Sequence, residues 1–230
     1  MEGLILAAGL GTRLRPLTND RPKALVEIEG RTLLEITMQR LVEAGVKRCV
    51  VNVHYFGDML IDFIQRHEWP CEVLVSDERQ LLLNTGGALK HAAPLFSGKE
   101  PVLVHNVDIL SDIDLCALER HHLASGNLVT LCTSRRETTR KLLFDRKGNL
   151  AGIYGQMDET GLTPLPFSGV SMLSPELFPL MPPDDHPYPV FGCYLELAKS
   201  HRIGYFMHPV GRWLDVGTPE TLEKAKSMFC

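Results

Sequence analysis

Short apolar runs alternate with segments of helical periodicity along most of the chain. Six runs have the length and composition of buried strands, at residues 3–7, 48–53, 71–76, 101–105, 127–132 and 203–208. Between the earlier runs, apolar residues recur three and four positions apart, in 32–46, 57–67, 85–96 and 115–125. Strands that alternate with helices predict right-handed crossovers and a mostly parallel sheet.

The pattern changes after residue 133. Shorter strand-like pieces at 141–145, 150–155 and 164–173 are joined by charged turns rich in glycine and proline. We therefore expect a Rossmann-like three-layer α/β/α sandwich, with a mostly parallel central sheet and a small antiparallel insertion in the second half. A chain of 230 residues suits one domain over 1–230, which we divide into halves 1–133 and 134–230.

Composition narrows the classes of protein that the chain can represent. The net charge of -4 argues against a general nucleic-acid binder. No apolar run approaches the roughly 20 residues that a membrane span needs, and no basic leader precedes the first run. The cysteines at 49, 71, 116, 132, 193 and 230 form no C-x-x-C pair, which favours reduced thiols in a cytoplasmic protein. The pair His121-His122 is expected on a solvated helix face.

A glycine-rich, cationic loop follows the first apolar run. Residues 6–25 read LAAGLGTRLRPLTNDRPKAL. The loop lacks the G-x-x-x-x-G-K-[ST] pattern of a P-loop, and Leu14 stands where a dinucleotide fingerprint needs its third glycine. Pro16 and Pro22 also prevent an early helix, which disfavours a nicotinamide-dependent dehydrogenase. The loop is therefore long, extended and cationic, and glycines after a first strand usually let the backbone approach phosphate closely.

This loop resembles the signature of the sugar-1-phosphate nucleotidyltransferases. Three further segments resemble motifs of that family, NTGGAL at 84–89, VHNVDI at 104–109 and RWLDVGTPETL at 212–222. The short length and the segment PFSGVSMLSPELF at 166–178 resemble most closely the bacterial N-acetylmuramate-1-phosphate uridylyltransferases of cell-wall recycling. Mannose- and heptose-1-phosphate guanylyltransferases are similar to a lesser degree.

The resemblance implies transfer of a nucleotidyl group from a nucleoside triphosphate to a sugar 1-phosphate, with release of pyrophosphate. The attacking phosphate oxygen is mostly ionised at pH 7, since its second pKa is about 6, so no protein base is required. Catalysis then depends on alignment and charge neutralisation. Arg13, Lys23 and Asp108 are the expected catalytic residues. The resemblance also implies a Mg²⁺ cofactor, with Asp108 and Asp215 as its ligands.

Substrate contacts follow from the same resemblance. We expect the nucleotide to bind Leu6, Ala7, Ala8, Gly9, Gly11, Thr12, Arg13, Glu78, Thr85 and Gly86, and the sugar phosphate to bind Lys23, Asn106, Ser168 and Gly169. Residues 1–133 would form the nucleotide-binding half and 134–230 the sugar-binding half.

Several questions stay open at this level. Val107 replaces the glycine that the family usually has, and its side chain could crowd the phosphate path or face the core. Glu78 could accept from a base N–H or be a surface carboxylate. The motifs do not specify which base or which sugar is used. A homodimer is a further expectation. A non-catalytic nucleotide-sensing subunit on the same fold is the alternative from another class of protein.

Overall fold

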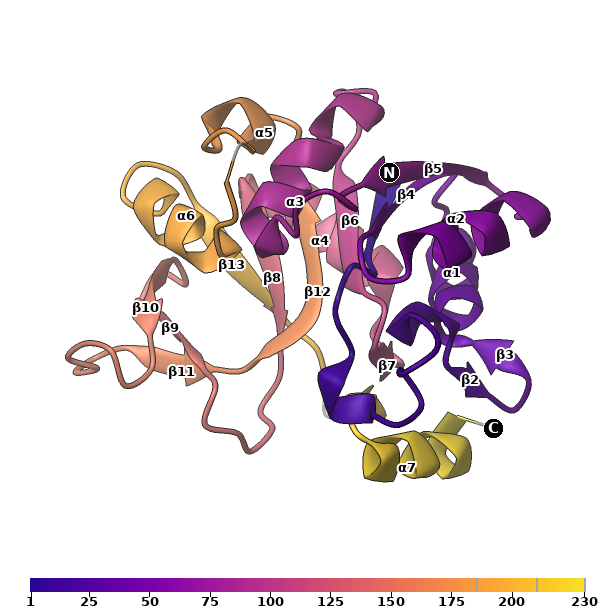
Figure 1. The fold of residues 1–230 in the computed structure, drawn as a ribbon. Coiled ribbons are helices and arrows are strands. Elements are labelled where there is room, and N and C mark those ends of the chain that lie inside the picture. The colour runs from indigo at the N-terminus through magenta and orange to yellow at the C-terminus, as the bar shows by residue number, and fades with distance from the viewer. Residues whose placement is uncertain (185, 210, 230) are drawn as a thin grey trace.

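Six of the seven strands in the main sheet are those that the sequence predicts. The computed structural model describes the chain apart from residues 185, 210 and 230, and its sheet has the order β13-β8-β12-β6-β1-β4-β5 (Figure 1). The strands are β1 (Glu2–Leu6), β4 (Arg48–Val53), β5 (Glu72–Asp77), β6 (Val102–Asn106), β8 (Val129–Thr133), β12 (Phe167–Leu173) and β13 (Ile203–Met207). All neighbouring pairs are parallel except those of β12.

Helices cover both faces of this sheet. They are α1 (Leu33–Glu43), α2 (Gly57–Arg66), α3 (Asn84–Ala92), α4 (Leu115–Ser125), α5 (Leu177–Leu180), α6 (Val190–Leu197) and α7 (Pro219–Phe229). Successive strand residues point to opposite faces, so Ile5 and Val51 pack in one apolar core and Leu4 and Val50 in the other. The first core includes side chains of α1, α2, α4 and α7, and the second those of α3, α5 and α6. The expected three-layer α/β/α architecture is confirmed.

Helix α1 shows how local sequence sets an element's bounds. The Thr32 hydroxyl accepts from Glu35 N at 3.2 Å while the Glu35 carboxylate accepts from Thr32 N at 2.7 Å, which is a capping box. The helix ends just before Gly45, whose φ of 96° suits glycine. Within the described residues, none of the helices is long and apolar enough to cross a membrane.

The antiparallel insertion is present but smaller than expected. It comprises β9 (Leu142–Phe144), β10 (Leu150–Ile153) and β11 (Thr163–Leu165), in the order β10-β9-β11. Figure 1 shows this small sheet on the opposite side of the molecule from α2. The predicted piece 164–173 does not lie wholly within it, because β12 is a central strand of the main sheet. Met172 faces one core and Leu173 the other, so a strand buried on both faces carries no amphipathic alternation to reveal its place.

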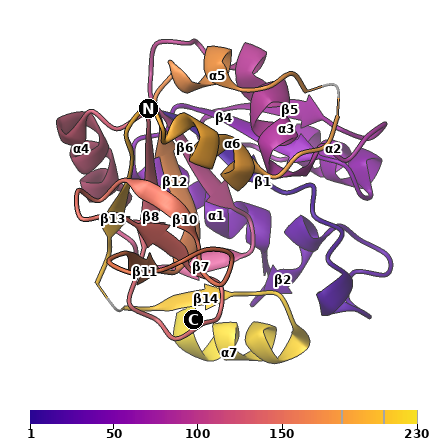
Figure 2. The same ribbon diagram turned by 90° about the vertical axis from the view of Figure 1, so that its left-hand side faces the viewer.

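A second small pairing joins the C-terminal segment to the middle of the chain. Strand β14 (Trp213–Asp215) pairs antiparallel with β7 (Ile109–Ser111), and Val216 N donates to Asp108 O at 2.8 Å. Figure 2 shows α7 beneath β14, at one end of the molecule. A two-stranded ribbon of β2 (Glu27–Ile28) and β3 (Arg31–Thr32) completes the strands. These connections place Asp108 and Asp215 near the carboxyl ends of the parallel strands, where open α/β sheets bind ligands.

His122 is buried rather than solvated, so the sequence-based expectation for this residue is wrong. Its Nδ1 lies 2.8 Å from the Thr130 hydroxyl and its Nε2 lies 3.0 Å from the Ser174 hydroxyl. The neighbouring His121 is exposed, as expected. Helix α4 packs on β8 and β12, so a side chain on its inner face meets hydroxyl groups of distant strands. Burial lowers the pKa of His122 to about 4.

We predict that the protein loses stability as the pH falls from about 6.5 to about 4. An unfolded histidine takes up its proton near pH 6.5, but His122 in the folded chain does so only near pH 4. Protons therefore favour the unfolded chain in that window, by at most about 1.4 kcal/mol per pH unit for this group. Urea unfolding of the His122→Gln variant should show a shallower pH dependence than wild type, whereas His121→Gln should not. Equal slopes for all three proteins would contradict the assignment.

Candidate functional site

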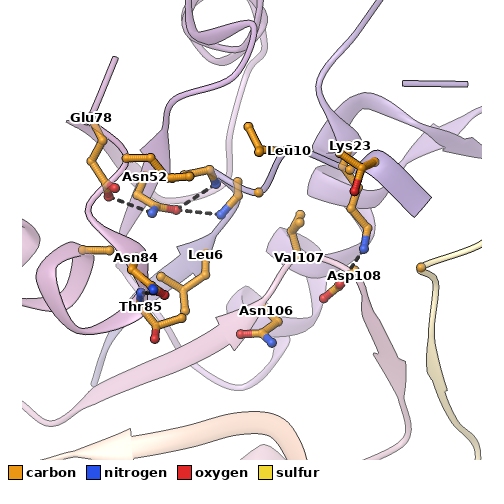
Figure 3. Close-up of a pocket in the computed structure, with 18 of the residues that line it drawn as sticks. Leu6, Leu10, Lys23, Asn52, Glu78, Asn84, Thr85, Asn106, Val107 and Asp108 are labelled. Atoms are coloured by element: carbon orange, nitrogen blue, oxygen red, sulfur yellow. Dashed lines mark hydrogen bonds and ion pairs between the residues drawn. The ribbon is translucent and has the colours of Figure 1, made fainter. Parts of the chain in front are cut away.

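A pocket of about 540 Å³ opens at the carboxyl ends of β1, β4 and β6, and twelve of the predicted site residues line it. Figure 3 shows its walls, formed by the loop after β1, the end of β5, the start of α3 and the end of β6. The predicted residues that it brings together are Leu6, Ala7, Ala8, Gly9, Gly11, Thr12, Arg13, Lys23, Glu78, Thr85, Asn106 and Asp108.

Eight further residues line the pocket that are not among the predicted catalytic, substrate-binding or metal-binding residues. They are Leu10, Asn52, Leu82, Asn84, Ala88, Val107, Pro187 and Gly217. Two of them carried a usable signal, since Asn52 is a polar residue at the end of a buried strand and Gly217 lies within the second acidic motif. The sequence around Pro187 gives no such signal, because this residue lies on a distant loop that reaches the pocket only in the folded chain.

The glycines of the loop serve two different purposes. Gly9 has open space where a Cβ would sit, so ligand atoms can approach the backbone there. Gly11 has a φ of 62°, and a Cβ on it would lie 3.0 Å from Thr18 and 3.2 Å from Lys23. Gly11 therefore allows the loop to fold back onto Thr18, whose hydroxyl donates to Gly11 O at 2.8 Å. This folding brings Lys23 to the pocket wall.

Asn52 and Glu78 hold the start of the loop in place. The Asn52 side-chain oxygen accepts from Ala7 N at 2.6 Å and from Ala8 N at 3.2 Å, and its amide nitrogen donates to Glu78 at 2.8 Å (Figure 3). The other Glu78 oxygen accepts from Leu83 N at 3.2 Å. Burial raises the pKa of Glu78, and these two hydrogen bonds act in the opposite direction.

This arrangement changes the interpretation of two predicted residues. Ala8 N already donates to Asn52, so its N–H is not among those free to cradle a phosphate. Glu78 is buried rather than on the surface, and both of its carboxylate oxygens accept hydrogen bonds from the protein. Glu78 therefore supports the glycine loop through Asn52 and organises the turn into α3.

Two cation–carboxylate pairs lie at the end of the pocket. Lys23 Nζ lies 2.5 Å from Asp108 Oδ2, and both side chains are largely covered. Arg13 Nη2 lies 3.7 Å from Asp215 Oδ2, with the arginine side chain 61% exposed. Asp215 does not itself line the pocket, although Gly217 beside it does. A cation from the glycine loop thus faces each predicted metal ligand.

The two aspartates suit a divalent metal ion. Asp215 Oδ1 is buried without a hydrogen-bond partner in the described structure, as expected of an oxygen meant for a ligand. A Cβ on Gly217 would lie 2.7 Å from that oxygen and 2.7 Å from Arg13, so glycine keeps the space open. Among the residues that the structure describes, no three His, Cys, Asp or Glu side chains could hold a metal by themselves. Mg²⁺ fits such a site, because it is typically held by one or two carboxylates together with substrate phosphates and water.

Val107 packs in the apolar core, although it also lies along the pocket wall. Its side chain is 3% exposed and packs in the same apolar core as α1, while its carbonyl accepts from the Thr37 hydroxyl at 3.3 Å. Replacement of the usual glycine thus leaves Asp108 in position. Gly86 is also turned inward, since its N–H donates to Tyr188 O at 2.9 Å and a Cβ would strike the Tyr188 ring. Gly86 does not line the pocket, but it lets the segment before α6 pack against α3.

The second-half residues predicted for the sugar phosphate lie beside the pocket rather than on its wall. A Cβ on Gly169, whose φ is 77°, would lie 3.3 Å from Asn106 Nδ2. Ser168 is fully buried, and its hydroxyl is 2.9 Å from His208 Nε2 and 3.0 Å from Arg136 Nη1. The Ser168 hydroxyl therefore contacts protein groups, and direct contact with the sugar phosphate is not available to it.

Comparison with known proteins identifies the class to which this fold and site belong. Residues 2–142 match the family model described as nucleotidyl transferase. The chain is 37% identical to N-acetylmuramate alpha-1-phosphate uridylyltransferase of Caulobacter vibrioides, over 94% of this chain and 92% of the relative. It is 31% identical to the enzyme of that name from Neisseria meningitidis serogroup B, over 99% and 98% of the two chains. The chain therefore belongs to the nucleotidyl transferase family.

A solved structure agrees with this assignment. The crystal structure of HddC from Yersinia pseudotuberculosis superposes with a TM-score of 0.80 at 25% identity, covering 100% of this chain and 99% of that chain. HddC has also been solved in complex with GMP-PN. The resemblance to sugar-1-phosphate nucleotidyltransferases inferred from the sequence motifs is confirmed.

We predict that Asn52→Ala weakens nucleotide binding as well as stability. The change leaves the Ala7 and Ala8 N–H groups and Glu78 without their shared partner. Loss of such buried hydrogen bonds costs about 1–3 kcal/mol, measurable by urea unfolding. Calorimetric titration with nucleoside triphosphate should show a larger Kd, because the loop is no longer held. Asn149→Ala, which removes hydrogen bonds far from the pocket, should lower stability but leave the Kd unchanged. A wild-type Kd in Asn52→Ala would show that the hydrogen bonds of Asn52 do not position the loop for nucleotide binding.

Proposed function

We propose that this protein catalyses Mg²⁺-dependent transfer of a uridylyl group from UTP to N-acetylmuramate 1-phosphate, producing UDP-N-acetylmuramate and pyrophosphate. One observation carries the proposal. The glycine loop lines a single pocket, and the Lys23–Asp108 and Arg13–Asp215 ion pairs lie together at one end of it. The choice of substrates is supported by the two uridylyltransferase relatives at 37% and 31% identity. A role in cell-wall recycling in the cytoplasm follows from that choice.

The residues of this chain would act by alignment and neutralisation of charge. Gly9 and the neighbouring loop leave room for the nucleotide, and Arg13 can hold the departing pyrophosphate with a forked guanidinium. Lys23 is a compact cation paired with Asp108, and it would lie between the α-phosphate and the sugar phosphate. No protein group needs to remove a proton, because the attacking phosphate oxygen is mostly ionised above its second pKa of about 6.

Asp108 and Asp215 are the residues that would hold Mg²⁺. When bound, the ion would neutralise phosphate charge that Arg13 and Lys23 leave uncompensated. The division of labour between the halves extends this proposal, with residues 1–133 binding the nucleotide and 134–230 the sugar phosphate.

A guanylyltransferase on another sugar phosphate is the nearest alternative. It is favoured by the HddC structure with GMP-PN, which matches the whole of this chain. A non-catalytic nucleotide-sensing subunit is the alternative from another class, but such a protein has no need to retain all of Arg13, Lys23, Asp108 and Asp215.

A pyrophosphate-release screen tests the proposal. UTP, GTP, CTP, ATP and dTTP are each combined with the 1-phosphates of N-acetylmuramate, N-acetylglucosamine, mannose and heptose in the presence of Mg²⁺. We expect the fastest release with UTP and N-acetylmuramate 1-phosphate. Fastest release with GTP and mannose or heptose would support the alternative substrate pair. Absence of release with every pair would refute the enzyme proposal.

We predict that Asp108→Asn and Asp215→Asn each lower kcat by about 100-fold or more, because each removes a negative charge directed at the metal and a partner of a loop cation. Circular dichroism should show that both variants remain folded. Asp114→Asn is the control, since asparagine caps a helix as well as aspartate does. Asp114 lies at the start of α4, where its carboxylate accepts from Ala117 N and pairs with the exposed Arg120. A near-normal kcat in either site variant would rule out the metal role of that residue.

A further inference from the structure

Arg136 is a half-buried cation at the same sheet edge as the pocket, on the loop between β8 and β9. This loop reads Ser-Arg-Arg-Glu-Thr-Thr-Arg-Lys over 134–141, so basic side chains outnumber acidic ones. Arg136 donates to the Ser134 hydroxyl at 3.2 Å, to the Ser168 hydroxyl at 3.0 Å and to Phe167 O at 2.5 Å. Arg136 is not among the site residues that the sequence predicts.

The guanidinium is held rigidly by groups that are themselves fixed. Its central carbon lies 3.9 Å from the centroid of the Trp213 ring. Trp213 Nε1 in turn donates to Ser168 O at 2.9 Å, and the Ser168 hydroxyl lies 2.9 Å from His208 Nε2. Stacking and several hydrogen bonds remove most of the rotamer freedom that an arginine would otherwise lose on binding a ligand.

Among the residues that the structure describes, no carboxylate is in contact with the guanidinium of Arg136. Within the described part of the chain, each oxygen that accepts from it is uncharged. Burial lowers its pKa, and the field of Asp215 opposes that effect without a close ion pair. Partial burial of a charge is unfavourable unless an opposite charge is supplied. An anionic ligand would meet this requirement.

The position of Arg136 points toward the acceptor side of the site. Trp213 and Asp215 are two residues apart on β14, so their side chains lie on the same face of that strand. Arg136 on the Trp213 ring is therefore on the Asp215 side. Gly169, which follows the Ser168 that Arg136 contacts, lies beside Asn106 on the pocket wall. Lys23 from the first half is paired with Asp108, and Arg136 from the second half stacks on Trp213, two residues before Asp215.

We propose that Arg136 binds an anionic oxygen of the acceptor sugar phosphate, either the carboxylate of an acidic sugar or the 1-phosphate itself. This inference rests on the proposed function, because it takes the sugar phosphate as the second substrate. Arg136 then completes the site from the second half, where Ser168 and His208 are positioning residues for its guanidinium.

Steady-state kinetics with two matched acceptors tests the proposal. N-acetylmuramate 1-phosphate carries a lactyl carboxylate that N-acetylglucosamine 1-phosphate lacks, and the sugar ring is otherwise the same. Arg136→Gln should raise the KM for the acceptor by about tenfold or more, as expected for loss of a charged hydrogen-bond donor, while the KM for UTP changes by less than about twofold. Arg136→Lys should recover part of the loss, because it restores charge but not the planar fork. Arg135→Gln, on an exposed neighbour, is the control.

The outcomes separate the possible roles. If KM rises only for N-acetylmuramate 1-phosphate, Arg136 binds the lactyl carboxylate. If KM rises equally for both acceptors, Arg136 binds the 1-phosphate. An unchanged KM for the acceptor would overturn the proposal. So would a parallel rise in the KM for UTP together with a lower Tm, because Arg136 would then only stabilise β12 through its hydrogen bonds. If no substrate pair releases pyrophosphate, the proposed function fails. Calorimetric binding of N-acetylmuramate 1-phosphate to wild type and Arg136→Gln would still decide the role of Arg136, with equal affinities counting against it.

Discussion

The pairing of β14 with β7 is the contact on which the site depends. It brings the C-terminal motif against the end of β6. The hydrogen bond from Val216 N to Asp108 O holds the segments that contain Asp108 and Asp215 side by side. Without this pairing, Asp108 would remain on the sheet edge but Asp215 would have no fixed place beside it. Because α7 packs against both β14 and β2, the same contact also ties the C-terminal helix to the region just after the glycine loop.

The cations of the loop and the aspartates of these strands form a balanced set of charges. Lys23 is paired with Asp108 and Arg13 with Asp215, so the positive side chains are held toward the site before any phosphate arrives. The more buried pair is the closer one, as expected where less water screens the attraction. The exposed Arg13 is freer to exchange its partner, which suits a residue that would hold a departing group.

The strands and the first-half site residues could be predicted because their signals are local. Apolar runs such as 48–53 coincide with β4, and the glycine loop after β1 is recognisable from its own residues. Strand β12 was harder, since its residues are buried on both faces and its neighbours come from other parts of the chain. Asn52, His122 and Arg136 were misjudged or missed, because the partners that define their roles are residues 26, 52 and 32 positions away.

The sequence by itself determined the class of fold, the phosphate-binding loop, the two acidic motifs and the family, because each is written in the order and spacing of a few residues. Only the tertiary structure decided which N–H groups of the loop are free, that Glu78 acts through Asn52, that the Ser168 hydroxyl contacts protein groups, and that Arg136 stacks on Trp213. The physical reason is that hydrogen bonding and burial depend on which distant strands meet at the sheet edge. The sequence around a single polar residue does not identify the group with which it forms a hydrogen bond.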